Sequence, residues 1–332
     1  QGRPGAHAGI EGHPLIADVL LVDQRAIGRT PRANILTYTK AMDALRRLLA
    51  DTDAARRNGL TPGHFSFNTP GGRCETCKGQ GFERVEMQFL SDIFVACAAC
   101  GGRRYLPAVL EVEYRGKNMH DILGLTVKQA LNLWENVPPF TKALQPVQRA
   151  GLGYLRLGQP LSTLSGGEAQ RLKLARYLTP AGNAPRLLIF DEPTTGLHMH
   201  DIARLLTAFG ELTAAGHTVL VIEHNMDVVK NADWVIDLGP EGGNDGGHVV
   251  AAGTPDQVAA CDRSHTGRFL VSYLDKRRRR TSMAAPKNKC AIVMEPAPAA
   301  ALKNTITING AHEHNLKNIS LAIPRDQLVV LS

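Results

Sequence analysis

Long apolar runs are absent from this sequence, in which no stretch approaches the roughly 18 consecutive apolar residues that cross a membrane. A signal peptide is not visible either, although the sequence opens on Gln1 and the true start can lie upstream. Cysteine is scarce, with 6 residues in 332, and four of these form two C-x-x-C pairs. Such pairs favour a metal site in a reducing cytosol over disulfide bonds. The composition therefore predicts a cytoplasmic protein that has no membrane partner and enough length for two domains.

Acidic residues are missing from residues 276–289, KRRRRTSMAAPKNK, where seven side chains are basic. The net charge of +7 is concentrated there, because the remaining residues balance at 31 basic and 31 acidic. Any nucleic-acid surface on the folded body must therefore be a local patch. The basic stretch and the Ala/Pro-rich residues that follow predict a flexible linker over residues 276–303.

The most specific pattern begins with STLSGGEAQRLKLARYL, residues 162–178. This stretch predicts a polar loop that enters a helix. Ser165, Gly166 and Gly167 place a hydroxyl and backbone N–H groups at the helix N-terminus, an arrangement that binds phosphate. A simple glycine turn before a helix is the alternative interpretation.

Two apolar runs end in polar side chains that suit a nucleotide site. Residues 187–190 predict a buried parallel strand that delivers Asp191 and Glu192 at its C-terminal end, where α/β sheets bind ligands. The run TVLVIE, residues 218–223, predicts a second buried strand, and His224 follows it directly. A packing or surface role is the alternative for a lone histidine.

The paired cysteines have the spacing C-x2-C-x19-C-x2-C, which lies in the range of a four-thiolate zinc site. Such a site is structural, because four thiolates leave no open coordination position. The alternating residues between the two pairs predict a β-hairpin that projects from the metal. A redox role is the weaker alternative, since neither pair opens a thioredoxin-like helix. The expected zinc ligands are Cys74, Cys77, Cys97 and Cys100.

Basic side chains near the cysteines and in the loop after the first predicted strand are candidates for contacts with DNA phosphates. Solvated surface residues are the alternative for each of them. The candidates are Arg29, Arg32, Arg73, Lys78, Arg84, Arg103 and Arg104.

Other segments predict individual helices and strands. Residues 109–116 alternate like a strand, and residues 121–137 have the spacing of one helix. Residues 304–332 contain a pair of strand patterns, of which the second, residues 327–331, is apolar. This last segment looks like the opening of a nucleotide-binding domain.

These motifs together resemble the UvrA family, the ABC-type ATPases of the bacterial UvrABC nucleotide-excision-repair system. The resemblance covers about residues 14–255 and rests on DQRAIGRTPRANILTYT, GGRCETCKGQGF, GQPLSTLSGGEAQRLKLA, DEPTTGLHMHD and VIEHNMDVVKNADWVIDLGPEGG. It implies an α/β fold, namely a partial ABC-type nucleotide-binding domain with an inserted four-cysteine zinc module. The sequence departs from the family at Arg25-Ala26 and at residues 33–35, and it contains no GxxxxGK[ST] motif. We therefore expect no ATP hydrolysis by this chain alone.

The resemblance also implies roles for the candidate residues in binding ATP and magnesium. Ser165 and Gly167 would contact the γ-phosphate of an ATP that a second nucleotide-binding domain or a second copy holds, and Gly166 would belong to the same cofactor-binding loop. Asp191 would hold magnesium, and Glu192 would orient the attacking water. His224 would contact the γ-phosphate, and Gln24 would act as the Q-loop glutamine. ATP hydrolysis would change the binding of damaged double-stranded DNA and the loading of a UvrB-like protein.

Two other functions compete with DNA-damage recognition in repair. A UvrA-like ATPase that gives resistance to DNA-binding antibiotics would have nearly the same sequence. A non-enzymatic zinc module of the DnaJ type is disfavoured, because the chain has only one good CxxCxGxG repeat. The expected division is a partial ATPase core with the Q-loop (1–60), a zinc module (61–115), a helical signature subdomain (116–160), an ATPase core (161–275), a linker (276–303) and the start of a second nucleotide-binding domain (304–332).

Overall fold

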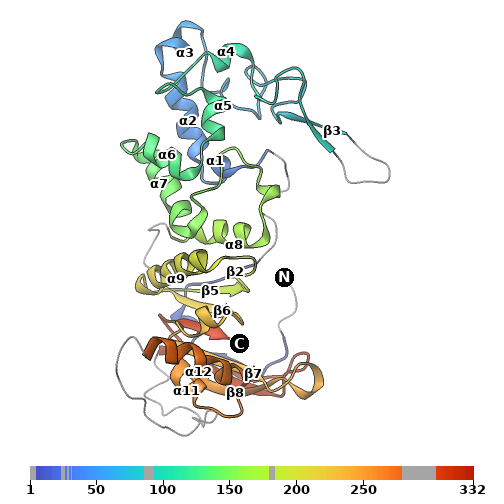
Figure 1. Ribbon diagram of the computed structural model, residues 1–332, viewed down its shortest axis with the longest axis vertical. Helices are drawn as coiled ribbons and strands as arrows, with labels where there is room; N and C mark the ends of the chain where they lie inside the picture. Colours follow the sequence, from blue (N-terminus) through green and yellow to red (C-terminus); the bar gives the residue numbers. More distant parts are fainter. Residues whose placement is uncertain are drawn as a thin grey trace. The chain divides into compact units, whose positions relative to one another are not determined.

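The computed structural model describes residues 5–23, 27, 30, 32–85, 93–178, 184–278 and 304–332. The chain forms two compact units (Figure 1). One consists of Gln1–Gln24 with Pro180–Ser332, and the other of Arg25–Thr179. Among the described helices, none is both long enough and apolar enough to cross a membrane.

A six-stranded sheet in the order β2-β5-β6-β11-β7-β8 organises the first unit. The strands from β2 to β7 in this order are parallel, and β8 is antiparallel to β7. The inner strands are apolar on both faces, as expected for a parallel sheet that is covered on both sides. The strands are β2 (Asp18–Val22), β5 (Arg186–Asp191), β6 (Thr218–Ile222), β11 (Leu328–Leu331), β7 (Trp234–Gly239) and β8 (His248–Gly253).

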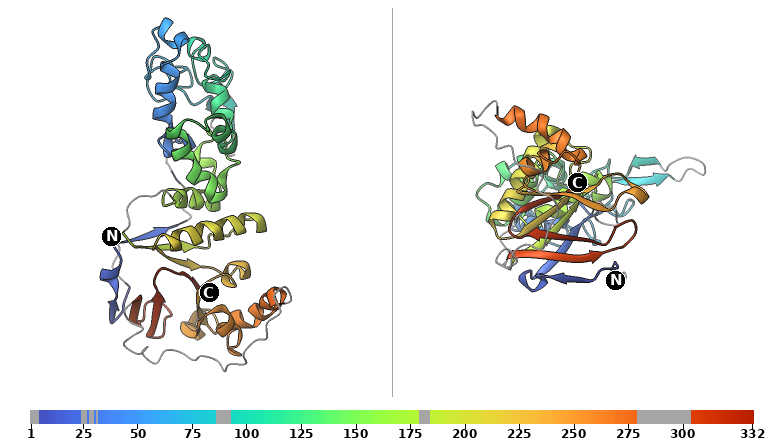
Figure 2. Two further views of the ribbon diagram at one scale, coloured as in Figure 1. Left: turned by 90° about the vertical axis from the view of Figure 1, so that its left-hand side faces the viewer. Right: turned by 90° about the horizontal axis from the view of Figure 1, so that it is seen from below.

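Different layers cover the two faces of this sheet. On one face, Phe190 of β5 packs against Phe209 of α9 (Met199–Ala214), with ring centroids 5.0 Å apart. On the other face, Leu187 and Val329 pack with Ile306 and other residues of a three-stranded antiparallel sheet. That smaller sheet has the order β1 (Gly9–Glu11), β9 (Thr305–Ala311), β10 (Ile319–Pro324), so segments from both ends of the chain lie side by side (Figure 2). The shorter elements are η1 (His13–Leu15), α10 (Met226–Val229), η4 (Gly243–Asp245), α11 (Pro255–Ala259) and α12 (His265–Arg278).

The second unit is helical apart from one β-hairpin. Trp134 stacks on Phe140 in its core, with ring centroids 4.5 Å apart, and both are buried. The hairpin pairs β3 (Phe82–Val85) with β4 (Ile93–Ala96), as the alternating pattern predicts, and it extends away from the helices of its unit (Figure 1). The helices are α1 (Ile35–Tyr38), α2 (Ala41–Ala50), α3 (Asp53–Arg57), α4 (Pro107–Leu110), α5 (Met119–Gly124), α6 (Val127–Leu133), α7 (Pro138–Val147), η2 (Gln148–Leu152), η3 (Leu161–Thr163) and α8 (Gly166–Ala175).

The strand expected at residues 109–116 is not formed. Pro107 instead begins the short helix α4, a position where the missing N–H of proline costs nothing. Val109 and Val112 are both buried, and their spacing of three residues is helical rather than alternating. The rest of the segment is a turn closed by hydrogen bonds between Tyr114 and Lys117.

The single helix expected at residues 121–137 is divided in two. The helix α5 ends at Gly124, and α6 begins after Thr126, whose side chain accepts a hydrogen bond from Gln129 N–H. Gln129 in turn accepts from Thr126 N–H, which completes a capping box. The strong cap stabilises a new helix start that apolar spacing alone does not indicate.

Candidate functional site

The carboxyl edge of the six-stranded sheet brings together three of the predicted nucleotide-site residues. Asp191 ends β5 and lies in register with Ile222, the last residue of β6. Glu192 follows Asp191, and its N–H donates to Ile222 O at 2.9 Å. His224 comes two residues after Ile222 and is exposed. Two carboxylates and one imidazole are therefore presented at the ends of neighbouring parallel strands, the usual position of ligand sites in such sheets.

Glu192 has an unusual backbone conformation. Its φ of 43° lies in the left-handed region, which residues other than glycine rarely adopt. Thr195 N–H donates to its carbonyl at 3.2 Å, and Thr195 Oγ1 donates to Oε2 of its carboxylate at 3.3 Å. Strained conformations of this kind cluster at functional sites, where the surrounding structure enforces them. The turn after β5 thus holds the Glu192 side chain exposed at the sheet edge.

Glu223 is a part of this edge that sequence reasoning missed. The residue is only 4% exposed, and its carboxylate accepts four hydrogen bonds. Thr194 donates to Oε1 from its N–H at 2.9 Å and from its hydroxyl, while His224 N–H and Asn225 N–H donate to Oε2 at 2.8 and 2.9 Å. Glu223 therefore ties the turn that carries Glu192 to the loop that carries His224. A charged residue at the end of a buried strand was the available signal, since buried carboxylates require such partners.

A second buried carboxylate, Asp237 of β7, ties α12 to the end of β11. Ser264 Oγ and Thr266 Oγ1 donate to its two oxygens at 2.5 and 2.9 Å. Thr266 Oγ1 also lies 3.1 Å from Ser332 Oγ. Burial raises the pKa of Asp237 above its ordinary value, although these hydrogen bonds act in the opposite direction. The network fixes the position of Ser332 at the same sheet edge.

The phosphate-binding loop predicted at Ser165 belongs to the other unit, Arg25–Thr179. Ser165 is the N-cap of α8 and accepts a hydrogen bond from Glu168 N–H at 3.2 Å, while Glu168 accepts from Ser165 N–H at 2.8 Å. Gly166 begins the helix and is exposed, whereas Gly167 is buried. The exposed end of a ten-residue helix can attract an anion. Gln24, the predicted Q-loop residue, lies outside the described residues.

The four cysteines converge on one point, as their spacing predicts. Their sulfur atoms all lie within 4.8 Å of one another, and each side chain is at most 5% exposed. Cys74 Sγ is 4.0 Å from Cys97 Sγ, and Cys77 Sγ is 3.8 Å from Cys100 Sγ. A tetrahedral zinc with bonds of ~2.3 Å separates its sulfur ligands by ~3.8 Å. The donor set therefore fits zinc in both chemistry and size.

The pKa values of the thiols in this cluster are shifted in different directions. Burial raises the pKa of Cys97 to about 12. At Cys74, burial acts in the same direction, but hydrogen bonds from the backbone and side chain of Cys77 outweigh it and lower the pKa to about 7. A bound Zn²⁺ deprotonates thiol ligands outright, so it would remove this difference.

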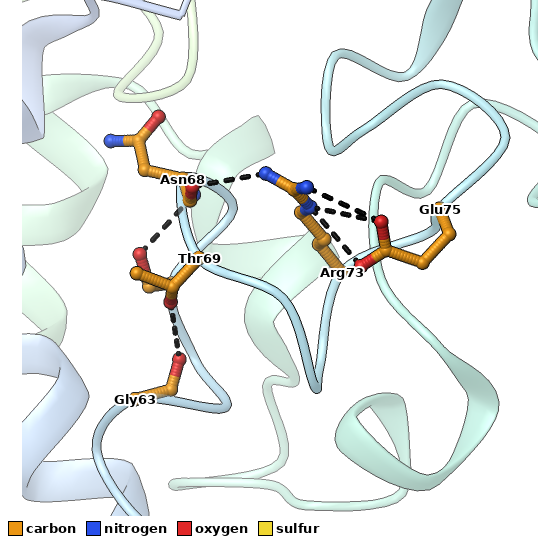
Figure 3. Close-up of polar contacts among 6 residues, drawn as sticks. Gly63, Asn68, Thr69, Arg73 and Glu75 are labelled. Atoms are coloured by element: carbon orange, nitrogen blue, oxygen red, sulfur yellow. Dashed lines mark hydrogen bonds and ion pairs between the residues drawn. The ribbon is translucent and has the colours of Figure 1, made fainter.

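Two of the predicted DNA-binding arginines have partners within the protein. Arg73 pairs with Glu75 at 3.2 Å and donates to Asn68 O at 2.9 Å (Figure 3). Arg104 donates to Gly158 O at 3.2 Å, and burial lowers the pKa of its guanidinium. Arg73 is therefore engaged inside the zinc module, whereas Arg104 ties that module to the segment before α8.

The remaining candidates differ in what surrounds them. Lys78 and Arg103 are exposed, and Arg103 Nε donates to Cys100 O at 3.2 Å. Arg84 lies in β3, but its side chain is outside what the structure describes, as is the whole of Arg29. Arg32 is half-buried and lines a pocket of about 480 Å³.

This pocket joins the predicted DNA-contact loop to the zinc module within one unit. Its lining includes the polar side chains of Arg32, Thr37, Asn68 and Gln80. No hydrogen bond is found for the buried Nε of Arg32 among the described residues. The Asn68 amide points away from the bonds that its backbone makes (Figure 3). A guanidinium and two amide side chains that line one pocket can bind an anion.

Comparisons with known proteins identify the relatives of this chain. Residues 108–195 match the ABC transporter family. The chain is 50% identical over 271 residues to UvrABC system protein A of Clostridium perfringens. The aligned region covers 82% of this chain and 29% of that protein. It is 53% identical over 270 residues to the protein of the same name from Methanothermobacter thermautotrophicus, with 81% of this chain and 28% of the relative covered.

A solved structure gives the same result. The crystal structure of UvrA2 from Deinococcus radiodurans superposes on this structure with a TM-score of 0.75 at 47% sequence identity. The superposed region covers 79% of this chain and 32% of the UvrA2 chain. The chain thus spans less than a third of the length of these relatives. The chain is therefore a homologue of UvrABC system protein A that carries part of an α/β ABC-type ATPase domain and a four-cysteine cluster consistent with a zinc module.

Proposed function

We propose that this chain is part of a UvrA-type, ATP-dependent protein that recognises damaged double-stranded DNA in nucleotide excision repair and loads a UvrB-like partner. The observation that carries this proposal is the combination, in one chain, of an ABC-type sheet edge and a four-cysteine cluster, at about 50% identity to UvrABC system protein A. A cytoplasmic location follows from the same proposal.

The sheet edge would act by positioning and by neutralising charge, which is how phosphoryl transfer is catalysed. Asp191 would hold Mg²⁺, Glu192 would orient the attacking water, and His224 would contact the γ-phosphate. Ser165 and Gly167 would complete the site of an ATP that is bound to a second nucleotide-binding domain or to another copy. Glu223 would hold Glu192 and His224 in register through its four hydrogen bonds. Gln24 would relay the nucleotide state to the DNA-binding elements.

The zinc module and the adjacent pocket would form the DNA-binding surface. Zinc held by Cys74, Cys77, Cys97 and Cys100 would fix the two turns from which the β3–β4 hairpin projects. Arg32, Lys78 and Arg103 would contact phosphates, since they are less committed to internal ion pairs than Arg73. Resistance to a DNA-binding antibiotic is the second candidate function, and it would use the same surface.

Replacement of Arg32 by glutamine is expected to weaken DNA binding and to reduce the salt dependence of the binding constant. Each lost phosphate contact removes about 0.9 from the slope of log K against log salt concentration. The measurement is fluorescence anisotropy of labelled intact and damaged duplexes with the full chain at several salt concentrations. The control is Arg47→Gln, which removes an exposed arginine outside the pocket.

The basic stretch provides a second comparison in the same assay. Neutralising residues 276–280 should weaken binding to damaged and intact duplexes by the same factor, because a dense cationic run contacts phosphates without reading DNA shape. An unchanged slope for Arg32→Gln would contradict the pocket assignment. Loss of discrimination on neutralising residues 276–280 would contradict the assignment of damage reading to the zinc module.

A further inference from the structure

Residues 304–332 supply an inner strand of the ATPase sheet rather than an appended element. Their last strand, β11, lies between β6 and β7 and is parallel to both. Val329 and Val330 are 0% exposed, so side chains on both faces of β11 are in the core. Strands β6 and β7 follow one another in the sequence, yet they pair through β11 and not with each other. A slot between β6 and β7 is therefore filled by a segment about a hundred residues away.

The backbone hydrogen bonds of this slot run along the whole of β11. Toward β6, Val219 N–H donates to Gln327 O and Glu223 N–H donates to Leu331 O, both at 3.0 Å. Toward β7, Leu238 N–H donates to Ser332 O at 2.7 Å, and Ser332 N–H donates to Ile236 O at 2.9 Å. Withdrawal of β11 would leave the facing groups of both neighbours without partners in the core, where an unpaired donor or acceptor is costly.

Side chains reinforce both ends of the insertion. At the start of β11, Asp233 Oδ2 accepts from Leu328 N–H at 2.8 Å, and Thr218 Oγ1 accepts from Asp326 N–H at 3.0 Å. At its end, the hydroxyl of Ser332 meets that of Thr266 beside Asp237. The same segment also provides β9 and β10, which cover one face of the sheet through Ile306 and Ile323. We call residues 304–332 the insert module.

The insert module also borders a pocket. A pocket of about 510 Å³ lies between β8 and the start of β10 and is lined by residues such as His248, Arg263 and Lys317. Every contact named above is non-covalent, and the chain reaches the module from α12 only through residues 279–303. The contacts therefore do not depend on which molecule carries the module, which is the condition for exchange of an identical element between copies.

We propose that the insert module is detachable and that the slot between β6 and β7 also accepts the insert module of a second copy of this chain. In this binding mode β11 of one copy inserts between β6 and β7 of the other, and β9 and β10 pack on one face of the recipient sheet. The pairing would complete the edge that carries Glu192 and His224 with a strand from another molecule. The proposal does not depend on the role of the protein in DNA repair.

The test uses the full chain with a site-specific protease sequence inserted between Ala300 and Ala301. Isotopically heavy and light preparations are folded, cleaved separately, mixed and examined by native mass spectrometry. We expect the cut fragments to remain associated and hybrids of a heavy body with a light module to appear after mixing. Cutting is needed because the intact connection presents each slot with its own module at an effective concentration on the order of mM.

Two results would overturn the proposal. Fragments that separate as soon as the chain is cut would show that the slot does not hold the module. Pairs that stay associated but never form hybrids, even after prolonged mixing, would show that the slot does not accept a second copy.

A matched pair of variants tests the strand assignment. Val330→Asp places a charge in the core and should abolish association of the cut fragments, whereas His314→Asp changes an exposed residue between β9 and β10 and should leave hybrid formation intact. Association that survives Val330→Asp would contradict insertion through β11. Because the unsubstituted chain carries the main test, the proposal stays falsifiable even if Val330→Asp fails to fold.

Discussion

Replacement of Glu192 by glutamine is expected to lower the rate of ATP turnover by about 100-fold or more while ATP binding persists. Glutamine keeps the shape of the side chain but lacks the charge that orients and deprotonates water. Since Glu192 is exposed and glutamine keeps an oxygen that can accept from Thr195 Oγ1, the substitution should leave the fold intact. The measurement requires a graft in which residues 14–255 replace the matching segment of the Clostridium perfringens relative, so that the rest of the protein is present.

The control for this experiment is Glu223→Ala in the same graft. Glu223 is buried and accepts four hydrogen bonds, so its removal leaves donors of Thr194, His224 and Asn225 without their partner. Each buried donor left unpaired costs about 1–3 kcal/mol. Glu223→Ala should therefore lower the free energy of unfolding, which Glu192→Gln should not. Turnover that is unimpaired in Glu192→Gln would show that Glu192 is only an acidic strand end.

Removal of one zinc ligand is expected to have the largest structural effect. Cys97→Ala should reduce zinc from about one ion per chain to near zero, because three thiolates no longer close the tetrahedron. The β3–β4 hairpin should then lose its protection from hydrogen exchange, since metal binding in small zinc modules supplies the folding free energy itself. The six-stranded sheet lies in the other compact unit and should keep its protection.

The measurements are metal analysis of the purified chain and hydrogen exchange followed by mass spectrometry. Thr76→Ala is the control, because it changes an exposed residue inside the other C-x-x-C turn, between Cys74 and Cys77, without removing a sulfur. Zinc retained by Cys97→Ala, or a hairpin that exchanges as in the unsubstituted chain, would contradict a structural metal site.

The parts of this molecule that sequence patterns predict best are those with local causes. The run from Leu187 to Phe190 is apolar because both of its faces are buried, and that pattern predicts the strand that ends at Asp191. The cysteine spacing predicts the convergence of four sulfurs, because each C-x-x-C turn fixes two of them. Ser165 is an N-cap because its hydroxyl satisfies a free N–H of the helix that follows.

The features that patterns do not predict depend on distant residues. Residues 327–331 read as a strand, but their place between β6 and β7 is set by partners about a hundred residues earlier. Arg73 and Arg104 resemble free phosphate ligands in the sequence, whereas Glu75 and Gly158 O engage them in the fold. The role of Glu223 requires the turn at Thr194 to lie beside it, which only the sheet register provides.

The most direct test of the proposed role in excision repair is survival after ultraviolet irradiation. A bacterial strain that lacks UvrABC system protein A would carry the graft described above, the same graft with Glu192→Gln, or no protein. The account predicts that the graft restores survival to a large extent and that the Glu192→Gln graft does not. A correctly folded graft that binds zinc and hydrolyses ATP but gives no protection would contradict a role in repair and favour the antibiotic-resistance alternative.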